Sequence, residues 1–132
     1  MKILLLGKNG QLGHELQRSL ASLGEIIALG RAELDMTDLY AVAKAVKDHH
    51  PDIIVNASAY TAVDKAESDQ LTCYLVNSAA PAILAGSAKA IGALLVHYST
   101  DYVFDGTKNT PYLPDDQPNP INYYGYSKLM GE

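Results

Sequence analysis

Three residues in the C-terminal third of the chain have the types and spacing that reduction of a carbonyl group requires. Tyr124 and Lys128 stand four residues apart in the stretch YYGYSK, so both side chains lie on one face if the stretch is helical. A phenol with a pKa of about 10 needs a neighbouring cation to favour its ionised form, and Lys128 could supply that cation. Thr100, which follows an apolar run, could donate a hydrogen bond to the same carbonyl oxygen. We interpret Thr100, Tyr124 and Lys128 as candidate catalytic residues, with Tyr124 as the proton donor.

The Tyr–Lys spacing is weak evidence when it is considered alone. The chain has nine tyrosines, one phenylalanine and no tryptophan, so a tyrosine four residues before a lysine can arise by chance. Tyr123 and Tyr126 lie in the same stretch, but neither has a lysine four residues later. The interpretation therefore depends on the elements that would bring a cofactor and a substrate to this helix.

The stretch GKNGQLG, between an apolar run and a periodic helical pattern, is typical of a dinucleotide-binding turn. Gly7 permits a tight turn, Gly10 lets the backbone approach a pyrophosphate, and Gly13 lets the helix pack close to the sheet. We expect the N–H groups of Gly10, Gln11 and Leu12 to be free to bind the phosphates. The spacing differs from the simplest dinucleotide fingerprint, and the alternative is a glycine turn that holds no ligand. The flanking strand and helix favour the dinucleotide site.

The end of the second apolar run predicts which dinucleotide binds. NAD-binding proteins usually carry an acidic residue there for the ribose 2′-hydroxyl, whereas NADP-binding proteins carry an arginine for the 2′-phosphate. Here the run ends Leu29-Gly30-Arg31, so the acid is missing and an arginine is in place. We predict NADPH in preference to NADH, with NADH still possible. The alternative is that Arg31 is an ordinary solvated loop arginine.

Strand and helix patterns alternate four times along the chain, which predicts βαβ units. Short apolar runs predict strands at residues 3–6, 26–29, 53–55 and 94–98, and periodic patterns predict helices at 11–23, 39–47 and 71–91. Thr37 or Asp38 is available as a helix N-cap, and Pro81 must bend or divide the third helix. A proline-rich loop at 105–121 precedes one more helix, which starts near Asn122. We expect an α/β fold: a doubly wound, mostly parallel Rossmann-type sheet with helices on both faces.

Composition excludes several classes of protein. The 132 residues allow one domain, and ten basic against fifteen acidic residues argue against a nucleic-acid surface. Cys73 is the only cysteine, so neither an intrachain disulfide nor a paired-cysteine metal site can form, and its apolar helix favours a core position. The N-terminal apolar run is too short for a signal peptide, and we judge no stretch long enough to span a membrane. We expect a cytoplasmic protein.

The glycine motif and the three candidate catalytic residues together resemble the extended short-chain dehydrogenase/reductase family. The stretches GKNGQLGHELQ, PDIIVNASAYTAVDKAE and HYSTDYVFDG are more specific, and resemble the dTDP-4-dehydrorhamnose reductases within that family. The resemblance implies an NAD(P)H-dependent oxidoreductase of dTDP-rhamnose biosynthesis. Its nucleotide-sugar substrate would be dTDP-4-dehydro-L-rhamnose, whose 4-keto group is reduced to give dTDP-L-rhamnose.

The same resemblance implies further binding residues. Asp35 and Met36 would line the adenine, and Asp101 would lie with Thr100 at the sugar. A capping role before the second helix is an almost equal alternative for Asp35. The cofactor-binding set that results is Gly7, Gly10, Gln11, Leu12, Gly13, Arg31, Asp35, Met36, Ala59, Tyr60, Tyr98, Tyr124 and Lys128.

The sequence supports a metal site and an oligomer less well than it supports the cofactor site. Some family members bind Mg²⁺ at a dimer interface through a glutamate that matches Glu15. Its partners would lie beyond residue 132, so we predict no metal. A homo-oligomer is possible.

Family members continue well beyond the Tyr–Lys helix. We therefore expect residues 1–132 to be the NADP(H)-binding N-terminal part of such a reductase, without the C-terminal region that grips the nucleotide-sugar. Activity alone should be low or absent, and the fourth strand or its neighbour should be an open sheet edge. Two alternatives remain: another extended-family epimerase or dehydratase of nucleotide-sugars, or a non-catalytic NADP-binding regulatory module.

Overall fold

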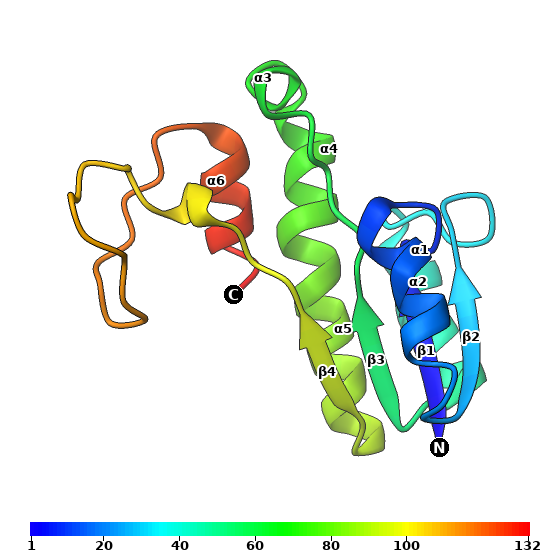
Figure 1. Ribbon diagram of the computed structural model, residues 1–132. Coiled ribbons are helices and arrows are strands. Elements are labelled where there is room, and N and C mark those ends of the chain that lie inside the picture. Colours follow the sequence, from blue (N-terminus) through cyan, green and yellow to red (C-terminus); the bar gives the residue numbers. More distant parts are fainter.

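Four parallel strands form one sheet in the computed structural model, which describes all of residues 1–132 (Figure 1). The strands are β1 (Lys2–Leu6), β2 (Glu25–Leu29), β3 (Ile53–Asn56) and β4 (Leu94–His97). Their order is β2-β1-β3-β4, and every neighbouring pair is parallel. β2 and β4 are therefore the two edges of the sheet, which confirms the open edge expected at the fourth strand.

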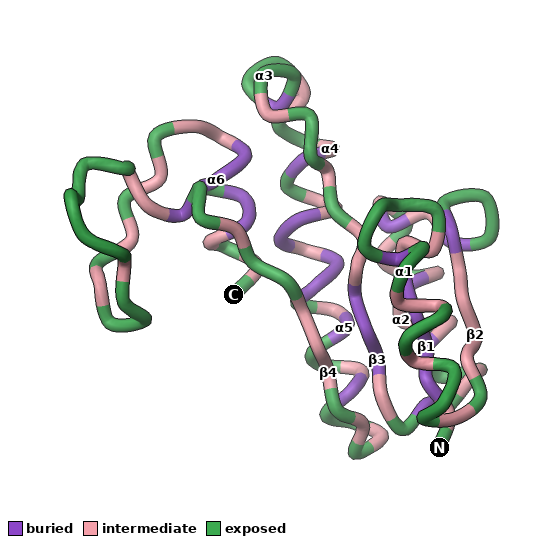
Figure 2. Tube along the Cα trace, viewed as in Figure 1, coloured by how far each residue is buried: buried purple, intermediate pink, exposed green.

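Helices cover both faces of the sheet, because alternate strand residues point to opposite sides. On one face Leu4, Leu6 and Ile54 pack against α2 (Leu39–His49) and α5 (Ala80–Ile91) in the largest core cluster. On the other face Ile3, Leu5 and Val55 pack against Leu16 of α1 (Gln11–Ser19) and Leu20 just after it. Figure 2 shows this burial as a continuous purple stretch along β1. The predicted α/β fold class is confirmed.

A continuous helical column runs from residue 70 to residue 91, and its hydrogen-bond pattern changes just before Pro81. It consists of α4 (Gln70–Tyr74), a π-helical turn η1 (Leu75–Ala79) and then α5. Pro81 lies in the first turn of α5, where its missing N–H disturbs the hydrogen-bond ladder least. The wide π turn just before it absorbs the change in register.

The length of this column corrects one expectation. The column has 22 residues, and an 18-residue window within it has a mean hydropathy of 1.2. By length and composition alone it could therefore cross a membrane, contrary to the sequence-based prediction. The structure gives the apolar residues another role, since Leu84 and Ala88 are buried in the core against the sheet.

Two further helices complete the fold, and one predicted helix is shorter than expected. The short α3 (Val63–Ala66) was not predicted, and α6 (Tyr123–Leu129) begins where expected, with the Asn122 side chain accepting a hydrogen bond from Gly125 N at 2.8 Å. α1 ends at Ser19 and not at Leu23, because the chain must turn there to start β2 beside the N-terminus. The Glu25 N–H donates to the Met1 carbonyl at 3.0 Å, which fixes that turn.

Candidate functional site

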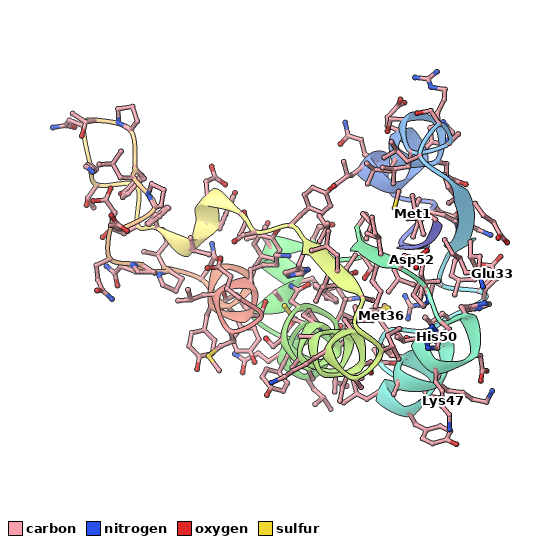
Figure 3. All side chains as sticks on the ribbon, turned by 90° about the horizontal axis from the view of Figure 1, so that it is seen from below. Met1, Glu33, Met36, Lys47, His50 and Asp52 are labelled. Atoms are coloured by element: carbon pink, nitrogen blue, oxygen red, sulfur yellow. The ribbon has the colours of Figure 1, made fainter.

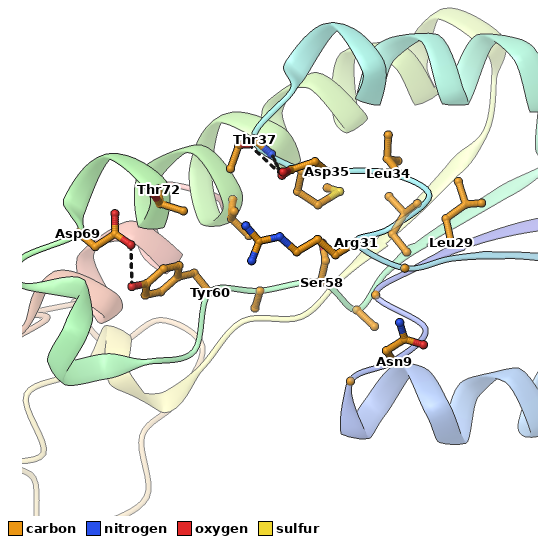
Figure 4. A pocket seen from close by; sticks show the side chains of 18 of the residues that line it. Asn9, Leu29, Arg31, Leu34, Asp35, Thr37, Ser58, Tyr60, Asp69 and Thr72 are labelled. Carbon is orange, nitrogen blue, oxygen red and sulfur yellow. Dashed lines mark hydrogen bonds between the residues drawn. The ribbon is translucent and has the colours of Figure 1, made fainter.

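A cleft of about 420 Å³ lies at the carboxyl ends of β1, β2 and β3. β1 is followed by β2 on one side of the sheet, whereas its other neighbour β3 is followed by β4 on the opposite side. The connections therefore reverse direction between β1 and β3, and this is the switch point at which open α/β sheets bind ligands. The cleft is lined by the glycine turn, the loop after β2, the segment after β3 and the start of the long helical column (Figure 4). Seven of the predicted cofactor residues line it: Gly7, Gly10, Arg31, Asp35, Met36, Ala59 and Tyr60.

Two glycines of the turn are required by the packing of the protein itself. Gly7 has a φ of 84°, and a Cβ there would lie 2.7 Å from Ser58 N. A Cβ on Gly13 would lie 2.0 Å from the Gly7 carbonyl oxygen, so only glycine lets α1 approach the turn this closely. At Gly10 the nearest atom would be 3.4 Å away, an ordinary contact. The packing of the protein itself therefore does not require glycine at position 10, and Gly10 lines the cleft.

The hydrogen bonds of the turn correct part of the phosphate-binding prediction. The Gly10 N–H donates to the Gly7 carbonyl at 3.0 Å, so it is not free as expected. This bond closes the tight turn that Gly7 begins. Gln11 and Leu12 open α1, and their N–H groups have no backbone acceptor, as is usual in a first helical turn. The structure thus leaves two free donors where the sequence predicted three.

Asp35 lines the cleft but does not cap the second helix. Its carboxylate accepts hydrogen bonds from the backbone N–H and the hydroxyl of Thr37, both at 2.9 Å, and these bonds lower the pKa of Asp35. The N-cap of α2 is Asp38, whose side chain accepts from Ala41 N at 2.9 Å. Figure 4 shows Arg31 extending across the cleft near Asp35, and Arg31 makes no ion pair.

The segment after β3 is tied to the helical column by Tyr60. Its hydroxyl donates to Asp69 at 3.0 Å, and its backbone N–H donates to the Asn77 side chain at 2.8 Å. Burial and the Asp69 carboxylate both raise the pKa of Tyr60. Neither Asp69 nor Asn77 was singled out from the sequence, since each acts through a partner distant along the chain.

The helix that carries Tyr124 packs tightly on the turn that follows Thr100. Thr100 is the N-cap of the 3-10 helix η2 (Asp101–Val103), and its hydroxyl accepts from Tyr102 N at 3.3 Å. A Cβ on Gly125 would lie 2.2 Å from the Tyr102 carbonyl, so α6 and η2 are in backbone contact. The Tyr124 ring meets Tyr102 edge-on at 5.5 Å and is only 9% exposed. The structure therefore brings the Thr100 segment and the Tyr124 helix together.

Lys128 is buried, and its ammonium group is held by the backbone after β4. Its side chain donates to the Tyr98 carbonyl at 2.6 Å, and burial lowers its pKa, although the Glu132 carboxylate acts in the opposite direction. Burial, followed by the Lys128 charge, also lowers the pKa of His97 at the end of β4. Tyr98 thus contacts Lys128 through its carbonyl oxygen.

A buried polar network joins α6 to the cleft. The Ser127 hydroxyl accepts from the Asn77 amide at 3.0 Å and lies 3.1 Å from the Cys73 sulfur. The same Asn77 amide donates to the Tyr60 carbonyl at 3.0 Å, and the Ser78 hydroxyl donates to the Ser127 carbonyl at 2.6 Å. Cys73 is fully buried, as the apolar pattern predicted. Because every polar group here has a partner, the network fixes α6 relative to the residues that line the cleft.

Asp105 organises the long loop beyond η2. Its carboxylate accepts hydrogen bonds from the Asn119 amide, the Thr107 hydroxyl and the Tyr112 hydroxyl, at 2.8–2.9 Å. These donors, with Asn119 foremost, hold the pKa of Asp105 far below its ordinary value. The Phe104 and Tyr112 rings stack at 4.2 Å beside this cluster. One carboxylate thus ties together both ends of a proline-rich loop that adjoins Thr100 and Tyr124.

We expect Asp105→Asn to loosen this loop. An asparagine cannot accept all of these bonds, so amide hydrogen exchange over residues 106–119 should rise about tenfold at neutral pH. Since the folded pKa of Asp105 is lowered, its stabilising effect on the loop is complete above the ordinary aspartate pKa of about 3.9. The effect declines below that pH and is lost only when the pH falls through the folded value. Asp115→Asn, a neutralisation in the same loop at a residue without side-chain hydrogen bonds, should change nothing. Equal exchange in the two variants would contradict this role.

The whole chain, residues 1–132, matches the family model described as RmlD substrate binding domain. The chain belongs to this family. It is 54% identical to a dTDP-4-dehydrorhamnose reductase of Burkholderia thailandensis over 132 residues, which are all of this chain and 44% of that protein. The resemblance inferred from the motifs is thereby confirmed.

Two solved structures agree with the RmlD assignment. A dTDP-4-dehydrorhamnose reductase of Clostridium acetobutylicum superposes with a TM-score of 0.95 at 42% identity, over 99% of this chain and 47% of that one. A dTDP-4-dehydrorhamnose reductase of Bacillus anthracis in complex with NADP gives a TM-score of 0.92 at 37% identity, over 98% and 47% respectively. The chain thus spans less than half the length of each of these relatives.

Proposed function

We propose that residues 1–132 form the NADP(H)-binding Rossmann domain of a reductase. Its reaction is the NADPH-dependent reduction of the 4-keto group of dTDP-4-dehydro-L-rhamnose to give dTDP-L-rhamnose. The observation that carries this proposal is the packing of the Tyr124–Lys128 helix against the Thr100 turn, together with the network that joins this helix to the cleft. The 54% identity to a reductase of that name supports the choice of substrate. Sugar contacts beyond Thr100 and Asp101 would come from the part of the relatives that this chain does not match.

The residues of the cleft fit a dinucleotide phosphate. The free N–H groups of Gln11 and Leu12 at the start of α1 would hold the pyrophosphate. Arg31 offers an unpaired guanidinium for a 2′-phosphate, and Met36, 8% exposed, offers an apolar surface for the adenine. NADP bound to the Bacillus anthracis relative supports the same choice.

The residues outside the cleft fit the reduction itself. NADPH, when bound, supplies the hydride. Tyr124 would protonate the developing alkoxide, and the Thr100 hydroxyl would donate a hydrogen bond to the same oxygen. Lys128 is held by the Tyr98 carbonyl one helical turn from Tyr124, where it would bind the cofactor ribose. Asp101, next to Thr100, would contact the sugar.

The cofactor preference is tested by Arg31→Ala. Loss of the guanidinium should weaken NADPH binding about 10- to 100-fold, because a charge-assisted contact to the 2′-phosphate disappears. NADH binding should change by less than about threefold, since NADH carries no phosphate there. The dissociation constants are compared by equilibrium titration of the wild type and the variant.

Arg18→Ala is the matched control for Arg31→Ala. Arg18 is an exposed arginine on α1 that pairs with Glu15 and does not line the cleft. Its loss removes the same charge from the protein and should leave both affinities unchanged. An equal loss of NADPH and NADH affinity in Arg31→Ala, or a wild type that prefers NADH, would refute the predicted role of Arg31.

A further inference from the structure

The loop after β2 brings a carboxylate back to the end of that strand, where the sequence has no acidic residue. A tight turn forms because the Glu33 and Leu34 N–H groups both donate to the Gly30 carbonyl, at 3.1 Å and 2.9 Å. The Glu33 side chain then folds over the turn, and its Oε2 accepts a hydrogen bond from Gly30 N at 2.8 Å. Position 30 has no acidic side chain of its own, but the carboxylate of Glu33, three residues later, lies beside it.

This carboxylate occupies the space into which a side chain at position 30 would point. A Cβ on Gly30 would lie 3.1 Å from Glu33 Oε2 and 2.6 Å from Asn9 Nδ2. Gly30 and Asn9 both line the cleft, so the Glu33 oxygen lies at its rim. In Figure 3, Glu33 lies toward the outside of the molecule beside β2, whereas Met36 lies in its interior. The Glu33 side chain is 44% exposed, so its carboxylate is accessible from solvent and lies next to two residues of the cleft, Gly30 and Asn9.

The rim of the cleft at Gly30 carries both signs of charge. Glu33 Oε1 forms an ion pair with Lys8 Nζ at 2.7 Å, and Arg31 follows Gly30 directly. The Lys8 side chain, followed by the Gly30 N–H, lowers the pKa of Glu33, so the carboxylate is ionised at neutral pH. A carboxylate in this place accepts hydrogen bonds from ribose hydroxyls, whereas lysine and arginine attract a 2′-phosphate.

We propose that Glu33 is a residue that sets the choice between NADH and NADPH at this site. With NADH, Glu33 accepts a hydrogen bond from the adenosine ribose in place of the missing strand-end acid and stays paired with Lys8. With NADPH, the 2′-phosphate competes with Glu33 for Lys8 and lies beside Arg31. The inference rests on the proposed function, because it requires that the cleft bind a dinucleotide.

Glu33→Gln separates these interactions. Glutamine keeps an oxygen that can accept from Gly30 N, but it removes the negative charge and releases Lys8. We expect NADH binding to weaken about tenfold and NADPH binding to strengthen about threefold, as measured by equilibrium titration of each cofactor. Lys8→Met is the second variant, and it should weaken NADPH about tenfold with little change for NADH. Asp48→Asn, which breaks an exposed ion pair with Lys44 on α2, is the matched control and should change neither affinity.

The outcomes distinguish this inference from the proposed function. If the folded wild-type chain binds neither cofactor, the proposed function fails and the role of Glu33 fails with it. If the wild type binds and Glu33→Gln changes both affinities equally or not at all, the role of Glu33 is overturned while the proposed function stands. A shift of the NADH to NADPH ratio in Glu33→Gln, opposite to that in Lys8→Met, supports the inference.

Discussion

Replacing Gly7 with alanine is expected to abolish measurable dinucleotide binding and to destabilise the fold. The φ of 84° is unfavourable for any residue with a Cβ, and the added carbon would lie 2.7 Å from Ser58 N and 2.8 Å from the Ala57 carbonyl oxygen. Relief requires the glycine turn and the segment after β3 to move apart, and both segments line the cleft. The free energy of unfolding should fall by about 2–4 kcal/mol.

Gly86→Ala is the matched control for this change. Gly86 lies in the middle of α5, its φ is not in the left-handed region, and nothing lies within 4 Å of an added Cβ. Alanine there should stabilise the helix by about 0.5–1 kcal/mol and leave cofactor binding unchanged. Both variants are compared by urea unfolding and by NADPH titration. A Gly7→Ala protein with wild-type stability and affinity would show that the turn does not shape the cleft.

Replacing Tyr124 with phenylalanine is expected to lower the rate of dTDP-4-dehydrorhamnose reduction by about 10²–10⁴-fold, the usual contribution of a general acid. Phenylalanine keeps the ring that packs edge-on against Tyr102, so the fold and NADPH affinity should change little. Tyr126→Phe, an exposed tyrosine two residues later on the same helix, is the control and should retain the full rate.

The assay follows NADPH oxidation in the presence of the nucleotide-sugar. If the chain alone shows no turnover, as the sequence leads us to expect, the measurement is made on the chain joined to the part of the Burkholderia thailandensis relative that it does not match. Equal rates for the wild type and Tyr124→Phe would remove Tyr124 from the proposed mechanism. A large loss in Tyr126→Phe would show instead that the rate depends on the packing of α6.

Local sequence patterns predict most of the fold because the sheet imposes them directly. Strands such as Ile3–Leu6 are buried on both faces, so their residues form continuous apolar runs that can be recognised without knowledge of their neighbours. The end of α1 was wrong by four residues, because its position depends on a contact between Glu25 and Met1. Nothing within the stretch LASLG reveals that contact.

The cofactor site was harder to predict than the fold, because some of its side chains come from residues at unexpected positions in the sequence. The sequence has no acidic side chain at position 30. The turn that places the Glu33 carboxylate beside Gly30 is recognised only from the hydrogen bonds in the structure. Asn77 was missed for a related reason, since its partners Tyr60 and Ser127 lie 17 and 50 residues away. A polar residue within the apolar, alanine-rich stretch 71–91 was the signal that could have identified it.

The central claim, that this chain forms an NADPH-binding unit by itself, is tested most directly by titrating NADPH and then NADH into the purified chain. The cofactor's own fluorescence reports binding without interference, because the protein contains no tryptophan. A thermal melt of the same sample shows whether the chain is folded. We expect a cooperative melt and saturable binding, with NADPH bound more tightly than NADH. A chain that melts cooperatively but binds neither cofactor would contradict the central claim.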